Sequence, residues 1–570
     1  MELRQYETDI LVIGSGAAGM MAARAAADQG ADVILIDKSV IGRGGATVLA
    51  QMTVAVALGE AEPDSVDLHA QDTLIGSRGL ADPDIVNAIV ERAPEVILEV
   101  EEYGVKWART KEGKRSQVVS PGHSRKRCVY VDILNTGGAT SSGLRKAIWR
   151  DPHITRLKNV MITRLLVDQG SVVGAVGFSM EDCEPVGIAA SAVTVATGGL
   201  TEVYARNSAS ANMTGDGYVL AAEAGAELCD MEMVQFFPIA HLFPPVVGID
   251  PIMWDPFRYK LGGRLLNGHH EEFMDRYNGE QSGVYTATRD QTTYAIFQEV
   301  EAGRGSPHGG AYLDFRMVPE QKLKEAFGPV IDILASQGID LTKDMVEVSP
   351  MAHFMLGGIR VDANMATSVP GLYACGEAIS GMHGANRLSG NAITEALVTG
   401  RIAGEQAALK RTNRMGITDV KVREEWDKLQ QFWHPRQVDK DEVSMLAMRR
   451  ELQQIMWDGA GPLRTEQSLR QALEKVQHLR RQCADSALSR PKRYALSLVE
   501  KIEIDNMMAV SEAIILGALH RKESRGAHVR LDYPENREQA VSTRFLYDHN
   551  GNWHLEETVL ASMSEERSDD

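Results

Sequence analysis

The residues with the clearest chemical meaning are glycines near the N-terminus. Gly14-Ser15-Gly16-Ala17-Ala18-Gly19 follows the apolar run Asp9–Ile13 and opens an Ala-rich stretch. A second apolar run, Asp32–Ile36, ends at Asp37, 23 positions after Gly14. Glycines at this spacing let the backbone turn tightly against a pyrophosphate, to which the following helix presents amide donors and a positive dipole. Asp37 then lies where an acid can hold ribose hydroxyls, so the pattern predicts a dinucleotide site.

Two further apolar runs are expected to end at the same crevice. Ala192–Ala196 precedes Thr197-Gly198-Gly199, and Gly371–Ala374 precedes Cys375-Gly376-Glu377. Together with the strand, helix and strand around the Gly-rich turn, they predict an α/β fold with a parallel sheet. Ligands of such folds bind at the carboxyl ends of the strands, so both turns are expected to border the cofactor.

Changes in composition divide the chain into five parts. Residues 1–235 and 351–414 are interpreted as the two parts of a Rossmann-like nucleotide-binding domain. Between them, residues 236–350 are rich in Pro, Gly and aromatic residues, which indicates an inserted capping domain. Residues 415–520 place apolar side chains three and four positions apart, as a packed helical domain does. Residues 521–570 form a C-terminal segment.

Charge and cysteine content exclude several functions. With 60 basic and 78 acidic residues, the net charge of −18 argues against nucleic-acid binding. The five cysteines are far apart and form no CxxC pair, so we expect neither a metal site nor a disulfide framework. No apolar run is long enough to span a membrane, and no secretory signal is present. We therefore expect a cytoplasmic protein that reaches a membrane only through partner subunits.

Three longer motifs carry a resemblance to a known family. VSPMAHFMLGGI (348–359), GMHGANRLSGNA (381–392) and RKESRGAHVRLDYPE (521–535) resemble the flavoprotein subunit of fumarate reductase and succinate dehydrogenase, a family related to L-aspartate oxidase. The resemblance runs from near residue 8 to about 535 in the family's order. It implies that the nucleotide is FAD, that Glu377 binds the ribityl chain, and that the helix starting at Asn391 points its N-terminus at the flavin. The expected cofactor-binding residues are Gly14, Ser15, Gly16, Ala17, Ala18, Gly19, Asp37, Lys38, Gly45, Ala46, Thr47, Gln51, Thr197, Gly198, Asp216, Glu377 and Asn391.

One departure from the family concerns the attachment of the flavin. The family's covalent linkage is made by a His in a segment resembling RSHTVAA, and the matching segment here is Gly44–Ala50. Ala46 stands where the His would be and has no nucleophilic atom. FAD is therefore expected to bind non-covalently, which in this family lowers the flavin potential and disfavours succinate oxidation.

The resemblance also implies a set of catalytic residues. Hydride passes between the flavin and one carbon of a C=C or CH–CH bond while the other carbon exchanges a proton. An Arg is the natural clamp for a substrate carboxylate, because its guanidinium forms a bidentate pair with it. Arg387 and His353 match the family's carboxylate-binding pair, and Arg289 matches its proton donor or acceptor. Asp255 and Arg258 match the relay that restores the proton on Arg289.

A second departure lies at the other end of the substrate. Where the family motif QYHPTG supplies a His to a second carboxylate, this chain has Phe237, and Trp254 replaces a Thr. A buried carboxylate facing two aromatic rings would cost several kcal/mol, on the order of 2–7. The sequence therefore favours a substrate with one carboxylate and a less polar remainder. The alternative is that neighbours such as His241 supply new donors.

Several functions stay open at this point. The leading hypothesis is a flavin reductase or dehydrogenase for an organic acid that exchanges electrons with an iron–sulfur protein. The alternatives are ordinary fumarate or succinate chemistry with a remodelled clamp, an adenylylsulfate-reductase-like enzyme, and an electron-transfer subunit without a substrate. Joint retention of Arg289, His353 and Arg387 argues against the last, because none of them is needed to hold FAD. L-Aspartate oxidase is disfavoured because its HPT and TE pattern is missing.

Overall fold

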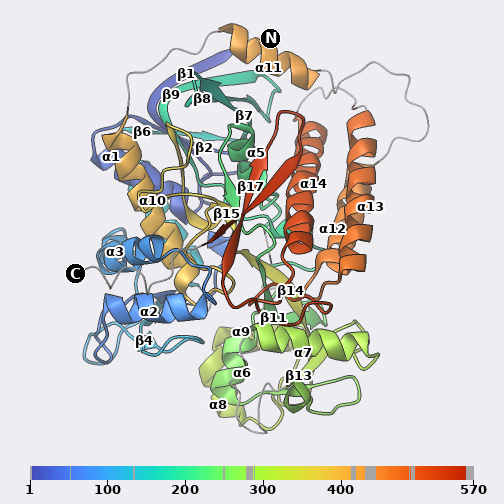
Figure 1. The fold of residues 1–570 in the computed structure, drawn as a ribbon. Helices are drawn as coiled ribbons and strands as arrows, with labels where there is room; N and C mark the ends of the chain where they lie inside the picture. Colours follow the sequence, from blue (N-terminus) through green and yellow to red (C-terminus); the bar gives the residue numbers. More distant parts are fainter. Residues whose placement is uncertain are drawn as a thin grey trace.

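The structure is a computed structural model of the chain. It describes residues 3–51, 53–131, 135–208, 210–247, 251–277, 287, 289–411, 419–430, 444–486, 488 and 494–559. The expected domain boundaries at residues 414 and 570 lie outside this range. In Figure 1, a domain built on a twisted sheet lies at the upper left, a helical region at the right and a smaller domain at the bottom.

The predicted strand, helix and strand are β1 (Arg4–Ile13), α1 (Ala17–Asp28) and β2 (Val33–Asp37). β1 pairs in parallel with β2 and with β9 (Pro185–Val195). The sheet runs β6-β2-β1-β9-β8-β7, and β16 (Leu372–Ala374) pairs in parallel with the carboxyl end of β9. The outer strands are β6 (Ile154–Lys158), β7 (Val160–Asp168) and β8 (Ser171–Ser179), of which β7 and β8 are antiparallel additions.

Small side chains bring two helices unusually close beneath the sheet. α1 packs along α10 (Asn391–Leu409), whose Gly400 and Gly404 face the backbone of α1. A Cβ added at Gly400 would lie 2.3 Å from the carbonyl oxygen of Ala18, and one at Gly404 would lie 2.2 Å from that of Ala22. The alanines of α1 and these glycines therefore set the distance between the glycine-rich turn and the start of α10.

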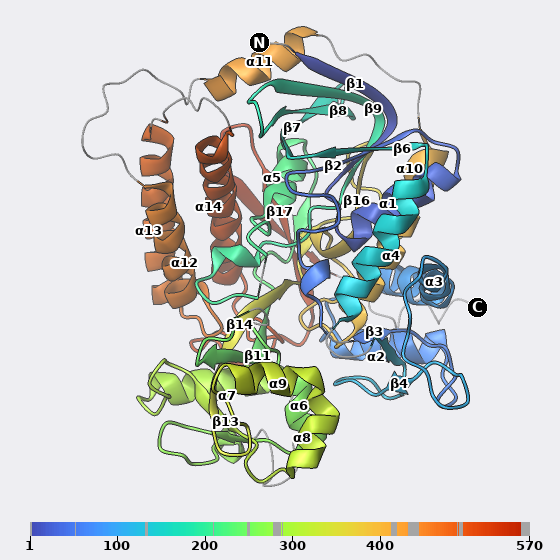
Figure 2. The same cartoon turned by 180° about the vertical axis from the view of Figure 1, so that it is seen from behind.

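The remaining elements of this domain surround the sheet. They are α2 (Val66–Gly76), α3 (Pro83–Glu102), α4 (Thr136–Arg150), α5 (Asp216–Glu223), a small sheet of β3 (Thr53–Ala55), β5 (Cys128–Tyr130) and β4 (Gln117–Val118), and the 3-10 turns η1 (Thr47–Leu49), η2 (Thr201–Val203) and η4 (Gly376–Ala378). Seen from behind, α4 lies on the near face of the domain, beside α1 (Figure 2).

Two long strands connect the capping domain to the nucleotide-binding domain. β11 (Val234–Phe243) and β14 (Val346–Met355) pair with each other and continue into β13 (Ala311–Asp314) and β12 (Arg264–Leu266). Residue 350, where we placed the end of this domain, lies inside β14. The helices α6 (Asp255–Leu261), α7 (Arg289–Glu301), α8 (Glu320–Phe327) and α9 (Pro329–Ser336), with η3 (Met274–Tyr277), enclose a hydrophobic core of their own.

The C-terminal part is helical and then closes with a hairpin. α12 (Met445–Ala460), α13 (Glu466–Asp485) and α14 (Leu496–His520) lie side by side, while α11 (Asp419–Gln430) covers the far end of the sheet (Figures 1 and 2). The hairpin of β17 (Val541–Tyr547) and β18 (Trp553–Val559) joins β10 (Leu228–Cys229) and β15 (Gly358–Ile359) in a further four-stranded sheet. In the described part of the chain, no helix has the length and apolarity needed to cross a bilayer.

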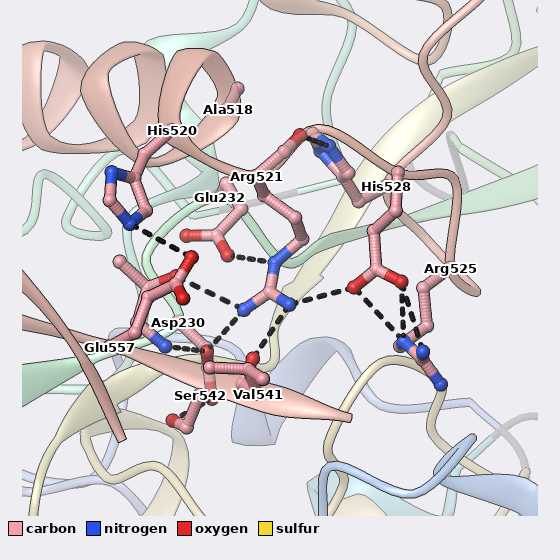
Figure 3. Close-up of polar contacts among 12 residues, drawn as sticks. Asp230, Glu232, Ala518, His520, Arg521, Arg525, His528, Val541, Ser542 and Glu557 are labelled. Carbon is pink, nitrogen blue, oxygen red and sulfur yellow. Dashed lines mark hydrogen bonds and ion pairs between the residues drawn. The ribbon is translucent and has the colours of Figure 1, made fainter. Parts of the chain in front are cut away.

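A buried charge network fixes the end of α14 to the strand that enters the capping domain (Figure 3). The guanidinium of Arg521 donates to Asp230 at 2.8 Å, to Glu232 at 2.5 Å and to Glu523 at 3.0 Å. All four side chains are less than a tenth exposed. Because β11 starts just after Glu232, this one guanidinium connects the C-terminal segment to the base of the capping domain.

Replacing Arg521 should therefore destabilise the whole chain. Arg521→Ala leaves three buried carboxylates without their shared cation. We therefore expect the free energy of unfolding to fall by about 3–5 kcal/mol, measured by urea unfolding at neutral pH. Arg470→Ala is the control, because Arg470 is 64% exposed and pairs with Glu466 on the surface of α13. It should cost less than about 1 kcal/mol. Equal losses of unfolding free energy for the two variants would contradict the stabilising role given to Arg521.

Candidate active site

A single cleft runs along the carboxyl ends of β1, β2, β9 and β16 and encloses about 1820 Å³ of space, part of it open to solvent. Backbone hydrogen bonds hold these strand ends together: Ala196 N donates to Ile13 O at 2.8 Å and Cys375 N to Val195 O at 3.0 Å. All but two of the predicted cofactor residues line the cleft: Gly14, Ser15, Gly16, Ala17, Ala18, Asp37, Lys38, Gly45, Ala46, Thr47, Gln51, Thr197, Gly198, Asp216 and Glu377. The two exceptions are Gly19 and Asn391.

The glycine-rich turn has the shape that a dinucleotide needs. Gly14 has a φ of +101°, and a Cβ there would lie 2.3 Å from the carbonyl oxygen of Ala196. The backbone N and the Oγ of Ser15 donate to one carboxylate oxygen of Asp37, at 2.8 and 2.6 Å. At Gly16, by contrast, the nearest atom to an added Cβ is Thr47 Oγ1 at 3.5 Å, so the ligand side of the turn is open. Gly19 shapes the turn from behind, because its Cβ would lie 1.9 Å from Gly14 O.

At the far end of the cleft, Glu503 of the helical domain joins two charged residues of the nucleotide-binding domain, Lys38 and Asp216. Lys38 Nζ donates to Asp216 at 2.6 Å, to Glu503 of α14 at 2.7 Å and to Thr214 at 2.8 Å. The two carboxylates hold the pKa of Lys38 above its usual range despite its burial. Thr197 also lines the cleft, and its buried Oγ1 has no hydrogen-bond partner among the described residues. A polar ligand with hydroxyl groups fits these residues.

At the other end of the cofactor cleft, the start of α10 has the expected position, but the side chain of Asn391 points away. Its amide donates to Thr73 Oγ1 at 3.1 Å, and its oxygen lies 2.9 Å from His69 Nε2. The helix N-terminus is instead presented by Gly390, which lines the cleft with a φ of +94°. Glu377 accepts a hydrogen bond from Met355 N at 3.0 Å, and burial raises the pKa of Glu377 to about 8.

Beyond Gly390 the cleft contains two buried arginines. Arg387 and Arg289 are 5% and 8% exposed, and both line the cleft. Arg387 Nε and Arg289 Nη1 have no hydrogen-bond partner among the described residues. Burial, aided by the charge of Arg289, lowers the pKa of Arg387 to about 9. Guanidinium nitrogens at this depth without a hydrogen-bond partner among the described residues form a site for an anion, and a carboxylate matches their geometry.

His353 lies beside the two arginines as a neutral donor or acceptor. Burial, with the charges of Arg387 and Arg289, holds the pKa of His353 well below its usual range. Its Nδ1 lies 2.8 Å from Ser208 Oγ, which fixes the ring and leaves Nε2 for a ligand. Phe237 packs edge-on against the imidazole, with ring centroids 5.3 Å apart. The same phenyl ring lies 4.9 Å from the guanidinium carbon of Arg289.

The predicted relay lies behind Arg289, within the capping domain. Arg289 is the first residue of α7, and its Nε lies 3.7 Å from a carboxylate oxygen of Asp255, the first residue of α6. Arg258 lies one turn further along α6 and is 1% exposed. Neither Asp255 nor Arg258 lines the cleft. Arg289 is therefore placed between the cleft and a buried acid.

Two expectations about the substrate pocket are wrong. Trp254 does not face the cleft: it is fully buried in the core of the capping domain, against Phe315 and Phe327. His241 cannot supply a new donor to the substrate, because its Nδ1 accepts from Trp254 Nε1 at 3.2 Å and its Nε2 is bonded to Pro244 O. The apolar neighbour of Phe237 in the cleft is instead Met253, at 8% exposure.

Among the cleft residues that were not predicted from the sequence, four lie beside the predicted substrate-binding residues. Ser208 orients His353, Ser389 Oγ lies 3.4 Å from Arg289 Nη2, and Phe354 lies under Arg387 with its ring centroid 4.3 Å from the guanidinium carbon. Met253 is the fourth. Phe354 and Met253 stand next to the predicted residues His353 and Trp254 in the sequence, and Ser389 is two positions from Arg387, which was the available signal. Ser208 lies in a loop whose residue types give none.

Comparison with known proteins defines the class and then the family. The FAD binding domain family matches residues 9–393, so the chain is a FAD-dependent oxidoreductase, and FAD is its cofactor. The fumarate reductase flavoprotein C-terminal family matches residues 449–566. The chain belongs to the fumarate reductase and succinate dehydrogenase flavoprotein family.

Relatives cover nearly the whole chain. One subunit of the CoM/CoB fumarate reductase of Methanothermobacter marburgensis is 34% identical over 94% of this chain and 96% of its own length. The L-aspartate oxidase of Streptomyces coelicolor is 32% identical over 92% of this chain and 89% of its own. Among solved structures, a mutated form of the quinol fumarate reductase flavoprotein of E. coli superimposes with a TM-score of 0.90 at 29% identity, covering 98% of both chains.

The position of Ala46 predicts how the flavin is held. Ala46 lines the cleft at the start of η1 and offers no atom for a covalent bond. Acid precipitation of the purified protein should therefore release all yellow colour into the supernatant. Yellow fluorescence that stays with the denatured chain on a gel would contradict this expectation.

Proposed function

We propose that this enzyme interconverts a C=C and a CH–CH bond in an organic acid that has one clamped carboxylate. The observation that carries the proposal is the pair of buried arginines, Arg387 and Arg289, that face one cleft with unpartnered hydrogen-bonding atoms beside His353. When bound, FAD supplies or accepts a hydride. The residues of this chain must then bind the acid, orient its double bond and exchange one proton.

Binding and orientation fall to Arg387 and His353. A carboxylate between them would pair with a guanidinium that lacks a partner and would accept from His353 Nε2. It would also offset the burial and the charge of Arg289, which together lower the pKa of Arg387. Clamping one end of the substrate fixes the position of the double bond next to it, which is the part of the rate enhancement that comes from positioning.

Proton exchange falls to Arg289 and the groups behind it. A free guanidinium is too basic to release a proton at neutral pH unless a neighbour acts with it and returns the proton at once. Asp255, 3.7 Å from Arg289 and fully buried, is such a neighbour, and Arg258 continues the series into the capping domain. Because both relay groups lie outside the cleft, they can move a proton without contacting the substrate.

The rest of the substrate faces an apolar wall. Phe237 and Met253 line the cleft where a second carboxylate would have to be held, and His241 is engaged elsewhere. This favours a mono-acid with an apolar substituent. Fumarate is the second candidate, because the 34% identical relative is named as a fumarate reductase. In that case Arg289 would have to bind the second carboxylate as well as exchange the proton.

Electrons are proposed to pass to or from an iron–sulfur protein. All five cysteines are buried, and no cluster of potential metal ligands is present within the described ranges. The relatives named as subunits support a complex of several chains. An oxidase that reacts directly with oxygen is the competing outcome, given the L-aspartate oxidase relative. Stoichiometric peroxide during substrate oxidation would favour it.

Arg289→Ala tests the proton relay. Loss of the exchanging group should lower kcat at least about 100-fold while KM changes less and FAD stays bound. Arg276→Ala serves as the control, since Arg276 is a 42% exposed arginine of the same domain. Turnover is measured with a reduced dye as electron donor. If Arg289→Ala keeps about a tenth of wild-type kcat, Arg289 is not the proton donor.

Phe237→His tests the apolar wall. The new donor should raise kcat/KM for fumarate relative to 2-enoic mono-acids by at least about tenfold, because a site that hydrogen-bonds a group discriminates strongly for it. Phe237→Leu is the matched control: it removes the ring but keeps the wall apolar, so the preference should not move toward fumarate. Should the unmodified enzyme reduce fumarate faster than every mono-acid tried, ordinary fumarate chemistry is the function.

A further inference from the structure

A basic hollow lies on the outside of the FAD domain, away from the active-site cleft. It is formed by α4, β6 and the loop after β2, and Figure 2 shows α4 on the near face of the domain. Its lining contains six cationic side chains and no acidic one: Arg43, Arg145, Lys146, Arg150, Arg156 and Lys158. In a chain with a net charge of −18, such a concentration of one sign is a local feature with its own electrostatic field.

Most of these cations are not neutralised within the chain. Among the described residues, Lys158 has the one ion pair of the six, with Glu181 at 3.8 Å, and both side chains are at least half exposed. Arg156 donates to the backbone oxygen of Ile148 at 2.9 Å and lies 4.5 Å from the centroid of the Trp149 ring. The hollow therefore presents unpaired positive charge to whatever approaches it.

Exposed apolar side chains accompany the charge. Trp149 is 70% exposed and Val40 is 49% exposed, and both line the hollow. A large aromatic ring surrounded by arginines is the composition of a protein contact surface rather than of an ordinary solvated face.

The hollow and the cofactor cleft share a wall one loop thick. Val40, Ile41 and Arg43 line the hollow, and most of residues 44–51 line the cleft. Ser141 Oγ of α4 donates to Gly42 O at 2.6 Å, and Gly42 N donates to Ser15 Oγ at 2.9 Å, in the glycine-rich turn. A molecule bound in the hollow would thus lie against the loop that encloses the flavin.

We propose that the basic hollow docks an acidic one-electron carrier protein that exchanges electrons with the flavin. This inference rests on the proposed function, since it names the face through which the electrons pass. Two encounters, each oxidising one carrier by one electron, supply the two electrons that, with two protons, convert one C=C bond to CH–CH. Opposite charge accelerates such encounters and makes them salt-dependent, and a small contact is sufficient for a transient redox pair.

The test uses the FAD-loaded enzyme with an acidic plant-type [2Fe–2S] ferredoxin as probe. Binding of the oxidised ferredoxin is measured by calorimetry, and bleaching of the flavin by the reduced ferredoxin is followed in a stopped-flow instrument without substrate. Both are measured from about 0.05 to about 0.5 M salt. The variant is Lys146→Glu with Arg150→Glu and Lys158→Glu. The control carries the same charge change on the capping domain, as Lys322→Glu with Lys324→Glu and Lys343→Glu, all exposed.

We expect the hollow variant to lose at least about tenfold in affinity and in bleaching rate at low salt, with the difference vanishing at high salt. The control variant should match the wild type, and reduction of the flavin by a small dye should be unchanged in both. Wild-type rates in the hollow variant, equal losses in the control, or no salt-dependent ferredoxin binding at all would overturn the proposal. Two other results would also overturn it. One is saturable quenching of the fluorescence of Trp149 by ATP, and the other is binding to anionic vesicles, if the wild type shows the effect and the hollow variant loses it. Dye-driven turnover of the enoates tests the proposed function separately.

Discussion

Burial of two guanidinium groups beside one cleft is the constraint on which the active site depends. Arg387 comes from the loop before α10 in the FAD domain and Arg289 from the start of α7 in the capping domain. Both are buried, and the charge of one lowers the pKa of the other. The two domains therefore bring like charges together at their interface, which an anion between them would relieve. Gln51 opposes the repulsion, because it bonds Pro251 O and accepts from Met253 N across the same interface.

The nucleotide-binding part could be predicted almost entirely from the sequence. Its strand, turn, helix and strand depend on local signals. These are glycines that the tight turn requires, an alanine-rich helix, and an acid at a fixed number of residues after the first glycine. Such signals determine structure within about 30 residues, as they do in other dinucleotide-binding units. Arg387, Arg289 and His353 needed more, because they come from three segments that only the fold brings together. For these the resemblance to a family supplied what periodicity could not.

The errors arose where the direction of a side chain decides its role. Asn391 begins a helix as expected, but its side chain turns toward His69 and leaves the backbone to face the cleft. Trp254 and Met253 are neighbours in the sequence, and the turn into α6 sends the larger one into the domain core and the smaller one to the cleft. A shift of one residue reverses such an assignment, and an irregular segment before a short helix has no period from which the direction could be read.

The bond between Lys38 and Glu503 places two residues 465 positions apart at one edge of the cofactor cleft. During synthesis, the glycine-rich turn and the β1–α1–β2 unit leave the ribosome long before α14 exists. Throughout that interval Lys38 has only the partners from its own domain, Asp216 and Thr214. The residues that line the cleft all lie between Ile13 and Ala396, so the cleft itself does not wait for α14, but the charge balance around Lys38 is completed only when Glu503 has been made.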